Sequence, residues 1–290
     1  MSNALRWLAA GLVCGVFATL LSIAGLQAED PVIPKPAAPD SAEKQNIEAA
    51  FTMTREAARK YQFETRQGDQ PAVLREQPIL RWSNPERGQI YGNVFLWTNR
   101  GRPVVVGSLF KWFSPFTHMS HEFHSLSVGE FRGRYNEADV WQSTQAGIAF
   151  AAVPDAPTVA TTVAARLAQM RQMARQFTTR TTDREGLKLE LRLLAQPVYR
   201  YELEKDSAEL SDGALFVFVQ GTDPELWLML EARSSAAKGG DVWQYALARM
   251  NSITFDVQHN GRDVWHRDTL ASKEIYSHKT PYTSFQFNMP

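Results

Sequence analysis

The chain has 290 residues, with 31 basic and 31 acidic side chains, and 44% of its residues are hydrophobic. This length can bury a large core in one large domain or two small ones. Balanced charge, without a long block of one sign, argues against a nucleic-acid or anionic-membrane binder. The one cysteine, Cys14, lies in the apolar leader, so a mature protein would have no disulfide, thiolate nucleophile or cysteine-ligated metal.

The first 28 residues have the pattern of an export signal. A basic start precedes an uncharged stretch from Leu8 to Leu26, and Ala28 supplies a small residue for cleavage. We therefore expect a signal peptide over residues 1–28 and a mature protein in the periplasm or outside the cell. An uncleaved membrane anchor is the alternative, because the apolar stretch nearly reaches the ~20 residues that span a bilayer. Residues 29–44 are rich in proline and are expected to form an extended linker.

After the linker, the next part of the chain is predicted to contain a helix followed by strands. Two β-rich runs, Gln89–Thr98 and Arg102–Trp112, flank a short segment whose sequence, Asn-Arg-Gly, is typical of a hairpin turn. Residues 118–124 are expected to form a further strand.

The second half of the chain is predicted to repeat this pattern. Apolar residues recur at helical spacing from Val163 to Phe177, which would leave three arginines on the solvent side: Arg166, Arg171 and Arg175. Two hairpins are expected after this helix. They are Ala214–Gln220 with Leu226–Ala232, and Ile253–Gln258 with Asp263–Arg267.

Several segments of the two halves align with each other. The matches keep their order along the chain, and the spacing between partners grows slowly, as small loop insertions would produce. We therefore predict an internal duplication, with repeat 1 over residues 45–153 and repeat 2 over residues 154–290. The aligned segments are Leu74–Trp82 with Leu193–Tyr201, Gly92–Trp97 with Gly213–Phe218, and Phe131–Trp141 with Phe255–Trp265.

The expected fold class is α+β. Each half would be one amphipathic helix packed on an antiparallel, hairpin-built β-sheet, because the pattern lacks the strand-helix alternation of a parallel sheet. The two halves could form two domains or one body with pseudo-twofold symmetry, and the sequence does not choose between these.

The sharpest difference between the aligned halves is a histidine-rich segment of the first half. His118, Glu122 and His124 would share one face of a strand, because alternate residues of a strand point to the same side. Two imidazoles and a carboxylate are a partial ligand set for Zn, Mn or Fe. The alternative is that they are ordinary polar residues of a strand that bind no metal.

Other chemistry is less well marked. The sequence contains no nucleophile elbow, P-loop or dinucleotide-binding glycine motif, and no catalytic residue is assigned. Its tryptophans could stack on sugars, although such side chains more often fill protein cores.

Four segments resemble a family of uncharacterised exported bacterial proteins. They are Val94–Phe116, His121–Ser127, Asp212–Pro224 and Trp243–Ser252. The resemblance implies that most of the mature chain is one recurring unit, and it implies no activity, cofactor or catalytic residue.

The sequence therefore favours an exported, non-enzymatic binding or scaffold protein of the cell envelope, without a cofactor, which contacts an envelope glycan or a protein partner. Nucleic acid is not expected as a partner, and the membrane is expected only if the leader stays attached. The alternative is a metal-dependent hydrolase or oxidoreductase that uses His118, Glu122 and His124. Whether the protein is an enzyme stays open at this point.

Overall fold

A computed structural model describes residues 41–65, 70–204 and 210–287. The predicted signal peptide and nearly all of the predicted linker lie outside these ranges. Residues 39–290 belong to one compact unit. None of the helices in the described ranges is long and apolar enough to cross a lipid bilayer.

The expected α+β class is wrong, because the chain is mostly β. Strands account for 51% of the residues and helices for 15%. The largest buried cluster is built from strand and loop residues, and no helix contributes to it. Long, continuously buried strands therefore dominate the packing, and the amphipathic helices that were expected to define each half are a minor part of it. The helices are α1 (Ser41–Ala58), α2 (Val163–Ala174) and α3 (Ser272–Ile275), with a short 3₁₀ turn η1 (Ala236–Lys238).

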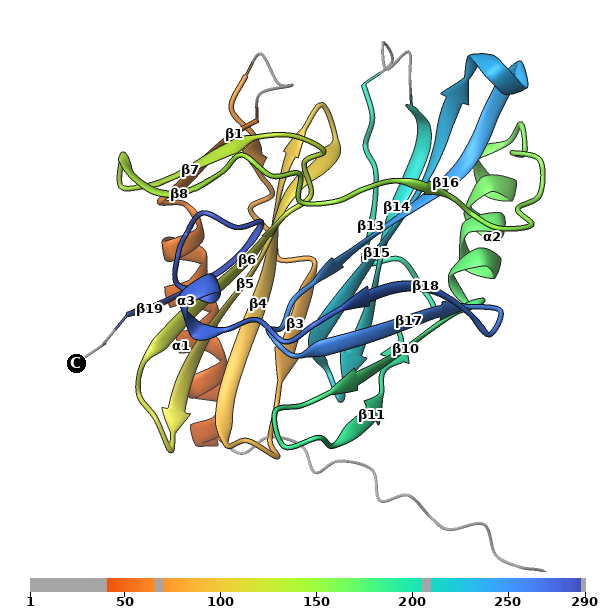
Figure 1. The fold of residues 1–290 in the computed structure, drawn as a ribbon. Coiled ribbons are helices and arrows are strands. Elements are labelled where there is room, and N and C mark those ends of the chain that lie inside the picture. Colours follow the sequence, from red (N-terminus) through yellow and green to blue (C-terminus); the bar gives the residue numbers. More distant parts are fainter. Residues whose placement is uncertain (1–40, 66–69, 205–209, 288–290) are drawn as a thin grey trace, which may run out of the picture. The chain divides into compact units, whose positions relative to one another are not determined.

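The first large sheet is antiparallel and has six strands (Figure 1). Its order is β19-β6-β5-β4-β2, and β3 also pairs with β4. The hairpin predicted around residues 99–101 is confirmed as β4 and β5. The strands are β2 (Val73–Leu74), β3 (Leu80–Ser83), β4 (Gln89–Asn99), β5 (Arg102–Ser114), β6 (Met119–Ser125) and β19 (Tyr282–Phe287).

The second large sheet is also antiparallel and has six strands. Its order is β12-β14-β15-β16-β9, and β13 also pairs with β14. The order β12-β14-β15-β16 repeats the order β2-β4-β5-β6 of the first sheet. The strands are β9 (Ala151–Ala152), β12 (Arg192–Leu193), β13 (Tyr199–Arg200), β14 (Leu210–Gln220), β15 (Asp223–Ser235) and β16 (Gly240–Arg249).

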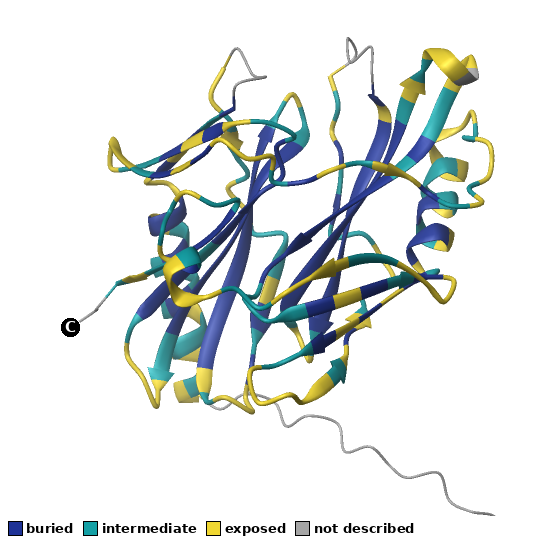
Figure 2. Ribbon diagram, viewed as in Figure 1, coloured by how far each residue is buried: buried dark blue, intermediate teal, exposed yellow. Residues whose placement is uncertain are grey.

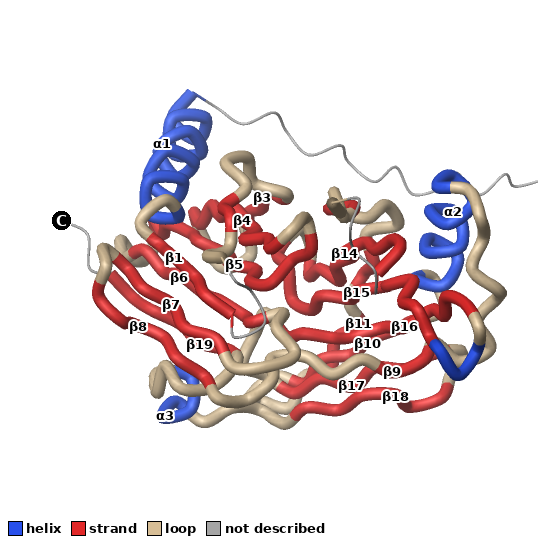
Figure 3. Tube along the Cα trace, turned by 90° about the horizontal axis from the view of Figure 1, so that it is seen from above, coloured by secondary structure: helices blue, strands red, loops and turns tan. Residues whose placement is uncertain are grey.

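Two smaller sheets lie outside the large ones (Figures 1 and 3). The three-stranded sheet has the order β1-β7-β8, and the four-stranded sheet has the order β11-β10-β17-β18. Their strands are β1 (Tyr61–Thr65), β7 (Phe131–Tyr135), β8 (Ala138–Ser143), β10 (Phe177–Thr182), β11 (Lys188–Glu190), β17 (Thr254–His259) and β18 (Arg262–Arg267).

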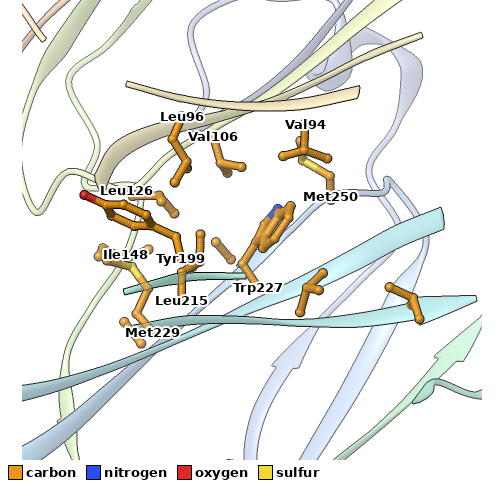
Figure 4. Packing of buried hydrophobic residues seen from close by; sticks show 14 of the residues in the cluster. Val94, Leu96, Val106, Leu126, Ile148, Tyr199, Leu215, Trp227, Met229 and Met250 are labelled. Carbon is orange, nitrogen blue, oxygen red and sulfur yellow. The ribbon is translucent and has the colours of Figure 1, made fainter. Parts of the chain in front are cut away.

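The two large sheets share one apolar layer. Side chains of the first sheet, such as Val94 and Val106, belong to the same cluster as Leu215, Trp227 and Met229 of the second (Figure 4). The strands that carry them are buried along most of their length (Figure 2). Each sheet therefore removes the other's apolar face from water, which is the main favourable term in folding.

Each large sheet is completed by a strand from the other half of the chain. β9, which follows β8, pairs with β16 in the second sheet, and β19, at the end of the chain, pairs with β6 in the first. The turns of the two long hairpins also bond across the layer. The Tyr199 hydroxyl donates to the Gly101 carbonyl at 2.9 Å, and the Thr222 hydroxyl donates to the Ser83 carbonyl at 2.8 Å.

A pair of glycine substitutions tests this contact between the hairpin turn and the opposite sheet. Gly101 and Gly221 both have positive φ, at +79° and +61°, but a Cβ on Gly101 would lie 2.0 Å from the Glu202 carbonyl oxygen, whereas one on Gly221 would meet nothing within 4 Å. We expect Gly221→Ala to lower the free energy of unfolding by about 1 kcal/mol through backbone strain alone. Gly101→Ala should cost about 1–3 kcal/mol more, because it adds a steric clash. Urea unfolding measures both, and equal losses would contradict the close approach.

Candidate functional site

The histidine-rich segment is divided between two environments. His118 precedes β6 and is half-buried, with its ring 6.0 Å from that of Trp112 and 5.6 Å from that of Phe116. Glu122 and His124 lie farther along β6, on the face that meets the layer between the large sheets. Since strand residues advance by about 3.3 Å each, His118 is roughly 13 Å from Glu122 along the chain. The structure therefore brings together Glu122 and His124 and leaves His118 apart.

His124 already has a partner within the protein. Its Nε2 lies 3.0 Å from the Gly147 carbonyl oxygen. Burial lowers the pKa of His124 to about 4, against the opposing effect of this hydrogen bond, so the imidazole is neutral at pH 7. In the described ranges, no three His, Cys, Asp or Glu side chains converge in a way that could hold a metal ion.

Glu122 instead belongs to a group of three carboxyls, which we call the carboxyl cluster: Glu122 on β6, and Asp223 and Glu225 on β15. Asn84 donates to Asp223 at 3.2 Å. Asn251 donates to Glu225 at 2.8 Å. Asp223 and Glu225 were not among the site residues predicted from the sequence. Their spacing could have indicated them, because Asp223 and Glu225 lie on either side of Pro224 in a buried strand and precede the core residue Trp227.

The carboxyl cluster holds protons at neutral pH. Burial raises the pKa of Glu122 to about 8, and the neighbouring Asp223 raises it further. Burial likewise raises the pKa of Asp223 to about 7 and places that of Glu225 well above its ordinary range. Arg87 opposes all three shifts, and burial outweighs it. A charged carboxylate without a close cation is costly in this layer, so the neutral acid is preferred.

A hollow of about 220 Å³ lies at the edge of the first large sheet, beside α1. We call it the α1 groove. Three aromatic residues, Phe51, Trp82 and Tyr91, line it together with Arg81 of β3 and Thr222 of the opposite hairpin turn. The remaining lining residues are Ile47, Ser83, Gly92 and Asn93. Both large sheets therefore contribute to its wall.

Cross-strand packing positions the aromatic wall. Trp82 pairs with Gly92 across β3 and β4, and a Cβ on Gly92 would lie 2.1 Å from the indole ring. The missing side chain lets the ring lie flat on the strand. The indole Nε1 then donates to the Ser108 hydroxyl at 3.0 Å. Trp82 is thus held in one orientation, and with 6% of its surface exposed it belongs to the apolar layer and borders the groove only by its edge of accessible surface.

The matching place in the second sheet is filled. Arg200 of β13 lies opposite Ala214 in β14, as Arg81 of β3 lies opposite Asn93 in β4. Arg200 donates to Asp212 at 2.5 Å.

A second arginine completes this ion-pair group. Arg166 of α2 also donates to Asp212, at 2.7 Å. Arg166 was expected to face solvent, and this is wrong: its side chain is only 13% exposed. The helical pattern of the sequence does not show that a buried carboxylate lies on the neighbouring strand.

The residues that fill the second site have different counterparts in the first. Tyr91 precedes Gly92 as Asp212 precedes Gly213. Alignment of Arg55–Tyr61 with Arg171–Phe177 places Ala50 opposite Arg166 and Phe51 opposite Leu167. Ala50 is fully buried and has no side chain that could reach into the groove. Two differences between the aligned segments therefore leave the α1 groove open. Comparison of the two halves of the sequence could have found these differences.

Comparison of the chain with known protein families, with curated proteins and with solved structures gave no match.

Neutral carboxyls in the layer should make the stability of the protein depend on pH. The pKa of Glu122 rises from about 4.5 to about 8 on folding. The folded state therefore binds a proton more tightly than the unfolded state. The contribution of Glu122 to stability is then fully present below about pH 4.5 and is lost as the pH rises towards 8.

Glu122→Gln removes one titrating group from the carboxyl cluster. We expect it to reduce the fall in unfolding free energy by up to about 1.4 kcal/mol per pH unit between pH 5 and 8. Urea unfolding at a series of pH values measures this, with the exposed Glu56→Gln as control. A slope that is the same in Glu122→Gln and in the unchanged protein would contradict the assignment.

Proposed function

We propose that the chain is an exported, non-enzymatic binding protein of the cell envelope and that the α1 groove is its binding site. The groove is lined by aromatic and polar side chains, which is the composition of sites for small ligands. An envelope glycan fits this description, because the apolar faces of a sugar pack on aromatic rings while its hydroxyls bond polar groups.

The observation that carries this proposal is the contrast between the α1 groove and its counterpart. The counterpart holds an ion-pair group that is closed by the protein's own side chains. The α1 groove keeps a hollow of about 220 Å³. Arg81, at its rim, has a side chain that is 51% exposed, so a ligand can reach it.

We further propose that the two halves arose by duplication of one β-rich unit. Several local contacts support this proposal. The backbone N–H of Asn136 donates to the backbone carbonyl of Lys60 at 3.1 Å, and the backbone N–H of Asn260 donates to the backbone carbonyl of Gln176 at 2.8 Å. Both asparagines have nearly the same left-handed backbone, with φ of 47° and 48°. A duplicated unit can keep its fold in one copy and change a surface groove in the other.

Matched substitutions in the two helices test the binding proposal. Phe51 of α1 lines the groove, and Leu167 is its counterpart on α2. We expect the full chain to bind a member of an array of bacterial envelope glycans. Phe51→Ala should weaken that binding about tenfold, because it removes an aromatic wall.

Leu167→Ala is the control and should leave the affinity unchanged. Isothermal titration calorimetry with the tightest glycan gives both values. Equal effects of the two substitutions, or no binding to any glycan of the array, would contradict the proposed function.

A further inference from the structure

We propose that the ligand of the α1 groove is an acidic sugar and that Arg81 binds its carboxylate. This inference rests on the proposed function and adds the chemical class of the ligand. It starts from the two matched arginines, Arg81 and Arg200, which occupy the same register on the strands that flank β4 and β14.

Arg200 shows what this position does when a carboxylate is present. Its Nη2 lies 2.5 Å from Oδ2 of Asp212 and its Nε lies 3.3 Å from Oδ1. Two guanidinium nitrogens thus contact two carboxylate oxygens, the two-point geometry for which arginine is suited. The protein therefore contains an internal example of the proposed contact.

Arg81 has the same backbone position without the same partner. Its guanidinium lies 4.0 Å above the Phe51 ring, which holds it at the groove rim. Its nearest carboxylate contact among the described residues is Glu48, at 3.9 Å. Glu48 has a 69% exposed side chain, so water screens this contact and leaves it weak. A carboxylate inside the groove could make shorter, charge-assisted bonds.

The other side chains of the groove agree with an acidic sugar. Arg81 is the one charged residue among the nine that line the hollow. Two acids contact its lining residues from outside this set: Glu48 contacts Arg81, and Glu43 accepts a hydrogen bond from the Tyr91 hydroxyl at 3.3 Å. Phe51, which is partly exposed, supplies apolar surface for a ring, and Ser83 supplies a hydroxyl. A ring with several hydroxyls and one carboxylate would use all of these groups.

The test compares D-glucuronate with its methyl ester, which has the same ring and no charge. Calorimetric titration of the full chain should show that glucuronate binds at least about tenfold more tightly than the ester, as expected for a charge-assisted contact. Arg81→Gln should remove this preference, so that glucuronate and its ester bind to the variant with the same affinity.

A second substitution copies the filled site into the groove. Tyr91→Asp places a carboxylate where Asp212 stands in the second sheet, so it should occupy Arg81 and abolish the preference for glucuronate. Gln62→Asp, the control, adds the same charge at an exposed position of β1 that does not line the groove, and should keep the preference. Circular dichroism would check that each variant is folded.

Three results would overturn the inference: equal affinity of the unchanged protein for acid and ester, no binding of either compound, or a preference for the acid that survives in Arg81→Gln. The proposed function is judged separately. Binding of an uncharged glycan that is lost in Phe51→Ala would uphold it even if the acidic ligand is wrong.

Discussion

The structure depends on one apolar layer shared by the two large sheets. Neither sheet has a second partner for this face, and the side chains on it, among them Trp227 and Met229, are fully buried. Separation of the sheets would expose both faces to water at once. The exchange of β9 and β19 and the bonds from the hairpin turns strengthen the same contact. This explains why residues 39–290 form one compact unit in place of two domains.

Polar groups enter the layer at its two ends and are satisfied in different ways. At one end Glu231, which is fully buried, bonds Arg102 and Arg233, each at 2.9 Å, and the Tyr201 hydroxyl at 3.0 Å. Its charge is matched by neighbouring cations, as a buried carboxylate requires. At the other end the carboxyl cluster has amide and hydroxyl partners and one arginine nearby, so its acids keep their protons. The stability of the packing at the end with the carboxyl cluster should thus depend on pH more than that at the end with Glu231.

Local patterns in the sequence predicted the hairpins well and the architecture poorly. The runs Gln89–Thr98 and Arg102–Trp112 are confirmed as β4 and β5, because turn chemistry and β-branched residues act over short distances. The α+β class was wrong because helical periodicity says how a helix is patterned and not how much of the core it fills. Arg166 was misplaced for a related reason: its partner Asp212 is remote in sequence and adjacent only in the folded chain.

The candidate site was predicted in part. Strand alternation correctly placed Glu122 and His124 on one face of β6, but His118 lies before the strand begins, beside Trp112 and Phe116. Asp223 and Glu225 approach Glu122 from the opposite sheet, and no local pattern reveals such a contact. The α1 groove, in contrast, could have been located from the alignment of the two halves. Tyr91 and Ala50 stand where Asp212 and Arg166 close the matching place in the second half.

A ligand should enter the α1 groove and not its filled counterpart. A titration of ¹⁵N-labelled protein with the array glycan that binds most tightly, followed by heteronuclear NMR, tests this. We expect shifts in the Trp82 indole signal and in the backbone amides of Phe51 and Asn93, with those of Leu167 and Arg200 unmoved. Shifts centred on Leu167 and Arg200, or no shift near Phe51 at a glycan concentration that saturates binding, would contradict binding in the groove.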